Sequence, residues 1–228
     1  RGIFNDHVAA RILAFVLAFA RGLHTYVPKQ LEHVWAPATL DSGVVPLPGS
    51  TALIVGVGGI GAETARLCSA FGMRVVGIDA RREDLPDGVA ELHPPSALDD
   101  LLPTADFVIL TIPHTPETEG LMNAERFGRM QSTAFFINIG RGKTTRLDDL
   151  NAALRSGQIA GAGLDVFEQE PLPADHPLWE APNTLLTPHT AGFGPHLDER
   201  RQEIIVDNAR RFVRGEPLRN VVDKAHWF

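Results

Sequence analysis

A glycine-rich turn at residues 55–61, VGVGGIG, constrains the fold more than any other feature of the sequence. It has the spacing Gly56-x-Gly58-x-x-Gly61, follows an apolar run and opens an amphipathic stretch that ends at Gly72. In this context the first glycine permits a tight turn, the second lets a phosphate approach the backbone, and the third lets helix and strand pack closely. The alternative is a plain tight turn. We predict a dinucleotide-binding βαβ unit with phosphates at a helix N-terminus.

An acidic residue follows the turn at the spacing expected for such a unit. Asp79 ends the second apolar run, MRVVGID, where a carboxylate can accept a hydrogen bond from a ribose 2′-hydroxyl. That carboxylate would repel a 2′-phosphate, whereas Arg81 and Arg82 could bind one unless they are simply solvated. We therefore expect NAD as the cofactor, and NADP stays possible through the two arginines.

Apolar strand-like runs alternate with amphipathic helical stretches along most of the chain. Short apolar strands without polar alternation, separated by helices, predict a parallel sheet that is covered on both faces. The fold class expected is α/β, with a Rossmann-type doubly wound parallel sheet. The strands are expected at residues 51–56, 73–79, 106–112, 133–139, 160–166 and 183–187, the helices at 60–71, 96–102, 147–154 and 197–213, and a connecting loop at 41–50.

The segment ILAFVLAFA, residues 12–20, is the most apolar stretch of the chain. It imitates the apolar region of a signal peptide, but it is too short to span a bilayer. Its apolar residues recur at helical spacing and Asn5 or Asp6 stands where a helix cap would, so we predict a packed helix. A helix this apolar should be covered by another domain or subunit. Because the sequence begins with Arg1, we also expect an upstream segment.

Composition excludes several classes of function. The net charge of −7 and the lack of a basic cluster argue against a nucleic-acid partner. Cys68 is the only cysteine, so no internal disulfide can form and a reducing, cytoplasmic location is expected. The histidines lack the spacing of metal ligands, and no membrane partner is expected.

Three polar residues follow predicted strands, the position where open α/β sheets bind ligands. Arg141 follows the buried run FFINIG, and a guanidinium there can hold a carboxylate through two parallel hydrogen bonds. Glu170 and His189 follow the next two runs. A histidine beside a carboxylate is fixed in one tautomer and can exchange a proton near neutral pH. The three residues predict a site that orients an anionic substrate and manages one proton.

The motifs together resemble the nucleotide-binding half of the D-specific 2-hydroxyacid dehydrogenases. The resemblance runs from about Val8 to about Val222 and rests on several motifs in the right order. These are the VA-rich first helix, Trp35, GVGGIG with Asp79, TIPHTPETEGLMN at 111–123, INIGRG, GLDVFEQEPLP at 161–173, TPHTAG and NVVD at 220–223.

The resemblance assigns a role to each matching residue. It implies that Arg141 grips the substrate carboxylate, that His189 is the general acid and base, and that Glu170 is its carboxylate partner. Asp165 matches the residue that meets the nicotinamide carboxamide. Other positions expected to line the cofactor, besides Arg141 and His189 themselves, are Gly56, Gly58, Gly59, Ile60, Gly61, Asp79, Ile112, Pro113, Thr118, Ile139, Gly140 and Gly192.

The implied activity is NAD(P)-dependent reduction of a 2-keto acid, or oxidation of the matching D-2-hydroxy acid, with glyoxylate or hydroxypyruvate favoured as substrate. The alternatives are an NAD(H)-sensing binding protein of the same fold and a phosphite dehydrogenase. Formate dehydrogenases pair their histidine with glutamine, whereas this chain has Glu170. Two departures from the family pattern concern the pocket and cofactor edge, namely Phe193-Gly194 and His114.

The resemblance also implies a domain organisation. Residues 1–191 form the dinucleotide-binding domain, and residues 192–228 are a C-terminal remnant of a flavodoxin-like substrate domain, whose other part would precede the first helix. Such a chain could bind the cofactor and still turn over poorly. A homodimer is expected, since family members of this type pair and the first helix is strongly apolar.

Overall fold

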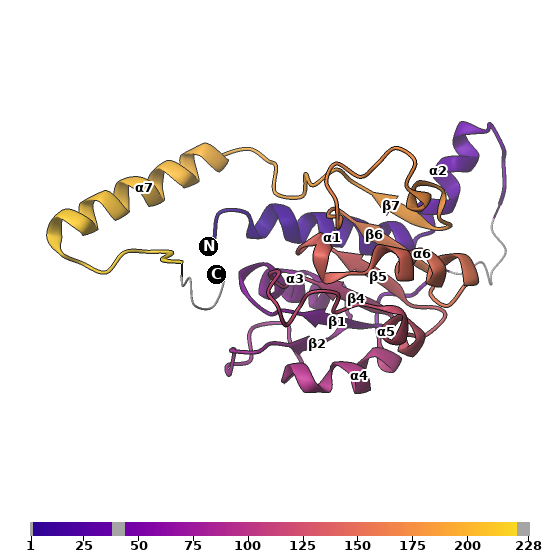
Figure 1. Cartoon of the computed structure of the whole chain (residues 1–228), viewed down its shortest axis with the longest axis horizontal. Coiled ribbons are helices and arrows are strands. Elements are labelled where there is room, and N and C mark those ends of the chain that lie inside the picture. The colour runs from indigo at the N-terminus through magenta and orange to yellow at the C-terminus, as the bar shows by residue number, and fades with distance from the viewer. Residues whose placement is uncertain (1, 38–43, 223–228) are drawn as a thin grey trace.

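A sheet of seven parallel strands forms the centre of the protein, as seen in a computed structural model that describes residues 2–37 and 44–222 (Figure 1). Residues 41–43 of the expected loop and residues 223–228 of the C-terminal segment lie outside the described residues. The strand order is β3-β2-β1-β4-β5-β6-β7. The strands are β1 (Thr51–Val55), β2 (Arg74–Ile78), β3 (Glu91–His93), β4 (Phe107–Leu110), β5 (Phe135–Asn138), β6 (Gly161–Leu164) and β7 (Thr184–Leu186).

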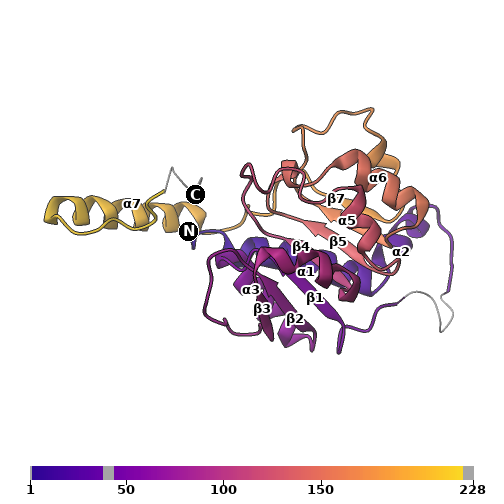
Figure 2. The ribbon, with the colours of Figure 1, turned by 60° about the horizontal axis from the view of Figure 1, so that its bottom comes forward.

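Helices cover both faces of the sheet, which confirms the predicted doubly wound α/β class (Figure 2). Successive side chains along each strand point to opposite faces of the sheet, so an apolar cluster forms on each face. Leu53, Val108 and Phe136 pack towards α4, α5 and α6, whereas Ile54 and Ile109 pack towards α1 and α3. The helices are α1 (Asn5–Ala20), α2 (Leu23–Leu31), α3 (Gly59–Ala70), α4 (Leu98–Leu101), α5 (Ala124–Arg129), α6 (Leu147–Ser156) and α7 (Leu197–Arg214).

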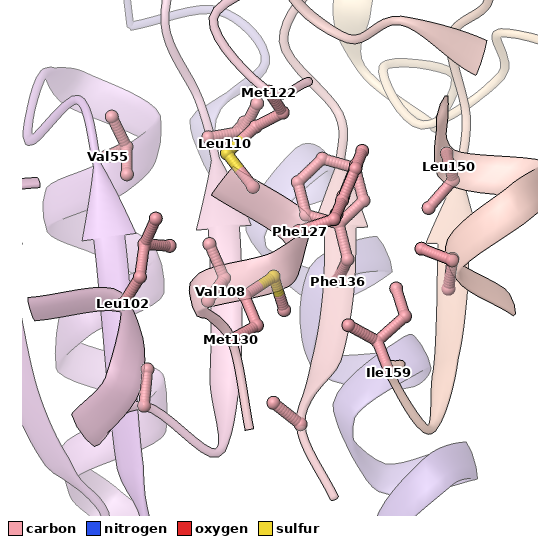
Figure 3. Packing of buried hydrophobic residues seen from close by; sticks show 14 of the residues in the cluster. Val55, Leu102, Val108, Leu110, Met122, Phe127, Met130, Phe136, Leu150 and Ile159 are labelled. Atoms are coloured by element: carbon pink, nitrogen blue, oxygen red, sulfur yellow. The ribbon is translucent and has the colours of Figure 1, made fainter. Parts of the chain in front are cut away.

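The first of these clusters is dense around two aromatic rings. Phe127 of α5 meets Phe136 of β5 edge to face, with 5.3 Å between ring centroids, and Met122 and Met130 fill the space beside them (Figure 3). All four side chains are almost fully buried. Burying one large apolar side chain contributes roughly 1.5–3 kcal/mol, so these contacts stabilise the packing of α5 on β5.

Helix α1 packs on the opposite face of the sheet. Ile12, Phe15 and Phe19 are buried, and Phe19 stacks on Phe135 of β5 with 4.6 Å between centroids. The predicted cap was wrong in detail, because the N-cap is Phe4 and no side chain caps the helix. The apolar stripe is therefore covered mainly within the domain, since it faces α3 and β5.

The chain turns sharply after α1, and apolar side chains are exposed beyond the turn. Gly22 has φ +68°, a left-handed conformation that glycine adopts at little cost, and it starts α2. No α2 residue is buried, and Leu31 and Trp35 are 76% and 93% exposed. Within the described residues no single helix is long and apolar enough to cross a membrane. Helices α1 and α2 taken together, with a bend of 75° between them, have the length and composition of a broken span.

Helix α7 extends away from the rest of the chain (Figures 1 and 2). Its first turn is attached to the start of α1, because Arg200 forms two hydrogen bonds with the carboxylate of Asp6, at 2.7 and 2.8 Å. Farther along, α7 exposes an apolar face that includes Ile205, Phe212 and Val213. The helix therefore has a fixed base and an apolar surface that no described residue covers.

Candidate active site

The strand order reverses between β1 and β4, so their carboxyl ends flank the crevice where open α/β sheets bind ligands. The glycine turn lies at this point. Gly56 has φ +96°, and a Cβ on Gly61 would stand 2.0 Å from the Gly56 carbonyl oxygen, so only glycine fits there. Gly58 is the N-cap of α3, no side chain caps that helix, and the space beside Gly58 is open. Gly59 and Ile60 form its first turn. The turn therefore fits a phosphate held by backbone amides.

Asp79 follows β2 and faces the same turn. Its carboxylate accepts hydrogen bonds from the amide of Val57, at 2.8 Å, and from the amides of Arg81 and Arg82, at 2.9 and 3.0 Å. The Arg82 guanidinium donates to the Val57 carbonyl oxygen, at 2.6 Å, and to Asp84, at 3.0 Å. Acid and arginine thus both lie against the glycine turn, where the ribose end of a dinucleotide would bind.

The loop after β4 brings further predicted residues to the crevice. Pro113 accepts a hydrogen bond from the Thr118 hydroxyl, at 2.8 Å, and that hydroxyl accepts one from the Thr115 amide, at 2.8 Å. A Cβ on Gly140 would stand 2.6 Å from the Ile112 carbonyl oxygen, so the turn after β5 packs closely on this loop. Ile139 follows β5 directly and is buried.

A buried amide fixes the backbone around Arg141. Asn138, the last residue of β5, is fully buried and donates to the Arg141 carbonyl oxygen and to the Thr145 hydroxyl, at 3.2 and 3.0 Å. Gly142 presses on the next loop, because a Cβ there would stand 1.8 Å from the carbonyl oxygen of Phe167. The Arg141 side chain stays exposed, with one hydrogen bond to the Gly140 carbonyl oxygen, at 2.7 Å. The guanidinium is therefore available on a rigid base.

His189 and Glu170 form a hydrogen-bonded pair. His189 Nδ1 lies 2.6 Å from Glu170 Oε2, and Glu170 Oε1 accepts a hydrogen bond from the Phe167 amide, at 2.9 Å. The carboxylate is thus held at one oxygen by the backbone and at the other by the imidazole. With Nδ1 engaged, Nε2 is the nitrogen left to exchange a proton with a substrate.

Asp165 contributes a contact that sequence reasoning missed. It is 1% exposed, and its carboxylate accepts hydrogen bonds from the Thr187 hydroxyl and from the amides of Thr190 and Ala191, the last two at 3.0 and 2.8 Å. His189 between them has φ +52°, an uncommon conformation for a residue with a side chain. Asp165 therefore holds the loop that carries His189, and no sequence motif signals this role separately from the cofactor contact that the resemblance implies.

A cavity of about 270 Å³ joins the strand-end residues. It brings together all three predicted catalytic side chains, and its walls also include His114 and Lys143, the second of which sequence reasoning missed. The lining residues are His114, Arg141, Gly142, Lys143, Phe167, Glu168, Glu170 and His189. Gly192 lies outside it, 3.4 Å from Phe4 at its nearest approach, measured from a Cβ built on the glycine.

A larger hollow, of about 550 Å³, is lined by residues of α1, α3 and α7, among them Asp6, Glu63, Arg66 and Arg200. Gly59 of the glycine turn and Asp87 also line it, but it contains none of Arg141, Glu170 and His189. Four of its charged groups are paired as Arg66–Glu63 and Arg200–Asp6. The smaller cavity is therefore the candidate active site. No group of three or more potential metal ligands is found among residues 2–37 and 44–222.

A parallel sheet with a phosphate turn, a strand-end acid and an arginine–histidine–glutamate cavity is the arrangement of a nicotinamide-dependent oxidoreductase. The chain belongs to the D-isomer specific 2-hydroxyacid dehydrogenase family, because the model of that family's NAD-binding domain matches residues 13–191. It is accordingly an NAD(P)-dependent oxidoreductase of 2-keto and 2-hydroxy acids.

Individual relatives agree with this assignment. A glyoxylate reductase from Korarchaeum cryptofilum is 43% identical in a match that covers 98% of this chain and 68% of that protein. The D-isomer specific 2-hydroxyacid dehydrogenase of Xanthobacter autotrophicus Py2, in complex with NADPH and MES, has a TM-score of 0.89 and 36% identity, covering 100% of this chain and 91% of the other. An NADPH-dependent glyoxylate/hydroxypyruvate reductase from Sinorhizobium meliloti, in complex with NADP and sulfate, has a TM-score of 0.86 and 30% identity, covering 99% and 70%.

Proposed function

We propose that this chain reduces a short 2-keto acid of the glyoxylate or hydroxypyruvate type, with Arg141, His189 and Glu170 as its catalytic residues. The observation that carries the proposal is the pairing of His189 with Glu170 at 2.6 Å in the same cavity as Arg141. Relatives named glyoxylate reductase and glyoxylate/hydroxypyruvate reductase at 43% and 30% identity support the substrate class.

The crevice beside that cavity fits a dinucleotide. The open, uncapped start of α3 offers amides to a pyrophosphate, and Asp79 lies where a ribose hydroxyl would be recognised. Residues Ile112, Pro113 and Gly140 would line the nicotinamide half, since they follow the strands nearest the cavity. When bound, the reduced nicotinamide supplies the hydride that converts the ketone to an alcohol.

The protein's own residues orient the substrate and move one proton. Arg141 would bind the substrate carboxylate through two parallel hydrogen bonds and thereby place the ketone near His189. His189 Nε2 would then donate a proton to the ketone oxygen and take it back in the reverse direction. Glu170, held by the Phe167 amide, keeps the proton on Nδ1 and stabilises the charged ring. Proton transfer of this kind contributes about 10²–10⁴-fold to the rate.

NADH is the proposed preferred cofactor. Asp79 keeps a negative charge against the glycine turn, and a 2′-phosphate would be repelled there. NADPH remains a weaker candidate, because Arg82 lies against the same turn and two similar proteins were solved with NADP or NADPH. Comparing the two cofactors at equal concentration tests this preference.

The domain division and the homodimer are also part of the proposal. We assign residues 1–191 to the dinucleotide-binding domain and 192–228 to a segment that joins a second, substrate-binding domain, consistent with α7 leaving the sheet and exposing its apolar face.

Helix α2 and Trp35 would form the homodimer contact, because a nine-residue helix without a buried residue is marginal alone. The proposal also includes a cytoplasmic location and no membrane or nucleic-acid partner. Sedimentation of the wild type and of Trp35→Ala tests the dimer.

The activity is tested by consumption of NADH and NADPH with glyoxylate, hydroxypyruvate, pyruvate and phenylpyruvate, on the wild type and on His189→Ala. Turnover that disappears in the variant while cofactor fluorescence still reports binding supports the proposal. Cofactor binding without turnover of any keto acid, in this chain and in one carrying an upstream segment, refutes it and favours a sensor. Oxidation of phosphite in place of the keto acids would assign a different substrate.

A further inference from the structure

The carboxylates and the cations that line the candidate active-site cavity differ in how far they are paired within the protein. Both oxygens of Glu170 are engaged, by His189 and by the Phe167 amide. Glu168 accepts a hydrogen bond from the Leu147 amide at one oxygen, at 2.8 Å, and its other oxygen lies 3.8 Å from Arg146. The carboxylates that line the cavity are therefore already partnered within the protein.

The cations that line the cavity are matched less completely. His114 lies 3.3 Å from Glu119. Within residues 2–37 and 44–222 the Arg141 guanidinium has one hydrogen bond, to the neighbouring Gly140 carbonyl oxygen, and no ion pair. Among the residues that the structure describes, the ammonium group of Lys143 has neither a hydrogen bond nor an ion pair. The cavity thus presents two cations, Arg141 and Lys143, that no carboxylate of the described chain neutralises.

Lys143 is held in place by its backbone. Its carbonyl oxygen accepts a hydrogen bond from the Gly120 amide, at 2.8 Å, and the Gly142 carbonyl oxygen accepts one from Thr145, at 3.0 Å. Gly142 has no room for a side chain, so the turn from Arg141 to Lys143 packs directly against the Phe167 loop. The backbones of Arg141 and Lys143 therefore keep a fixed relative position, while both exposed side chains can adjust to a ligand.

A substrate with one carboxylate can neutralise only one of these charges. We propose that Lys143 extends the substrate range beyond the glyoxylate type to longer 2-keto acids that carry a second anionic group, a carboxylate or a phosphate, at the end away from the ketoacid carboxylate, and favours them over longer acids without that group. The proposal rests on the proposed function, in which Arg141 binds the first carboxylate. A lysine suits this task because its compact charge on a flexible stem does not require one planar geometry, unlike a guanidinium.

The test compares one-charge and two-charge substrates on one protein. Glyoxylate, hydroxypyruvate and pyruvate carry a single anion, oxaloacetate and 2-oxoglutarate add a carboxylate, and 3-phosphohydroxypyruvate adds a phosphate. The variants are Lys143→Met, which keeps length without charge, and Lys143→Arg, which keeps the charge. Arg129→Gln is the matched control, because it removes a cation from α5, where it pairs with Glu125 outside the cavity.

We expect kcat/KM for the two-charge substrates to exceed that for pyruvate in the wild type and to fall about tenfold in Lys143→Met. One-charge substrates should change less than about twofold, and Lys143→Arg should keep most of the preference. The preference should weaken as salt rises from ~0.05 to ~0.5 M, since the lysine is exposed. An equal loss for both substrate classes, a loss matched by Arg129→Gln, or no preference in the wild type overturns the proposal. The ranking of carboxylate and phosphate substrates identifies the second group.

A binding measurement separates this proposal from the proposed function. Titration of the protein–NADH complex with oxamate, which has one charge, and with N-oxalylglycine, which has two, requires no turnover. N-oxalylglycine should bind about tenfold more tightly than oxamate in the wild type and equally in Lys143→Met. If turnover is absent and this difference is present, the catalytic assignment fails while Lys143 keeps its role. If turnover is present and the difference is absent, only the role of Lys143 fails.

Discussion

Replacing Asp165 should have its main effect on the loop that carries His189. The buried carboxylate accepts three hydrogen bonds, from Thr187, Thr190 and Ala191. In Asp165→Asn the amide oxygen can keep two of these donors, but its NH₂ group then faces the third. A hydrogen bond to a charged acceptor contributes about 1.5–3 kcal/mol, so we expect unfolding free energy to fall by about 2 kcal/mol.

Asp165→Ala should cost more, because it leaves all three donors without the carboxylate. Each unsatisfied buried donor costs about 1–3 kcal/mol, and water entering the space would recover part of this, so a loss of about 3–5 kcal/mol is expected. The loss is large against a typical stability of about 5–15 kcal/mol. His189 would also lose the constraint that holds it at φ +52°, a conformation that costs of order 1–3 kcal/mol. The variant should therefore lose a larger share of its turnover than of its folded population.

Urea unfolding and steady-state kinetics on Asp165→Asn, beside Asp106→Asn, test this reasoning. Asp106 accepts a hydrogen bond from the Thr51 amide, at 2.7 Å, at the amino end of β1 and so away from the cavity. The control should lose stability without losing kcat. Unchanged stability of Asp165→Asn with a raised KM for the cofactor alone would refute the loop-holding role and leave only the carboxamide contact that the resemblance implies.

Three further predictions concern other parts of the domain. Glu170→Gln should lower kcat about 10²-fold while keeping stability within about 1 kcal/mol, measured by the same two assays, because the Phe167 amide can still bond to the glutamine oxygen. Asp79→Ser should raise kcat/KM with NADPH relative to NADH by at least about tenfold, since the repulsive charge is removed. The Arg200 guanidinium lowers the pKa of the Asp6 carboxyl, so the pair should stabilise the fold above about pH 5 and lose that effect as pH falls below about 4. Because both side chains are partly exposed, Asp6→Asn should cost under about 1 kcal/mol in urea unfolding at pH 7.

Most of the sheet could be predicted from the sequence because its strands are buried on both faces. Runs such as residues 106–112 have no polar alternation, and that pattern places β4 among buried parallel strands. The exceptions are informative. Strand β3 has only three residues, Glu91–His93, and two of them are polar, so no apolar run marks it. Helix α5 has six residues, too few for a helical period to be recognised.

The candidate site was predictable in its residue types and not in its supporting contacts. Arg141, Glu170 and His189 stand in recognisable motifs, and the structure brings them to one cavity. The contact that Asp165 makes with the His189 loop depends on two strands lying side by side, since β6 and β7 pair in register and carry their following loops together. Sequence spacing alone carries no information about such a pairing until the sheet order is known.

The proposed catalytic pair is open to solvent. The side chains of His189 and Glu170 are 50% and 35% exposed, so water reaches both and screens their charges. Hydride and proton transfer benefit from a site that excludes water, and the cavity as described is open. We therefore expect a covering element over the cavity to raise the activity. The proposed second domain would supply it, because α7 leaves the loop of His189 directly and is anchored at its start by the Arg200–Asp6 pair.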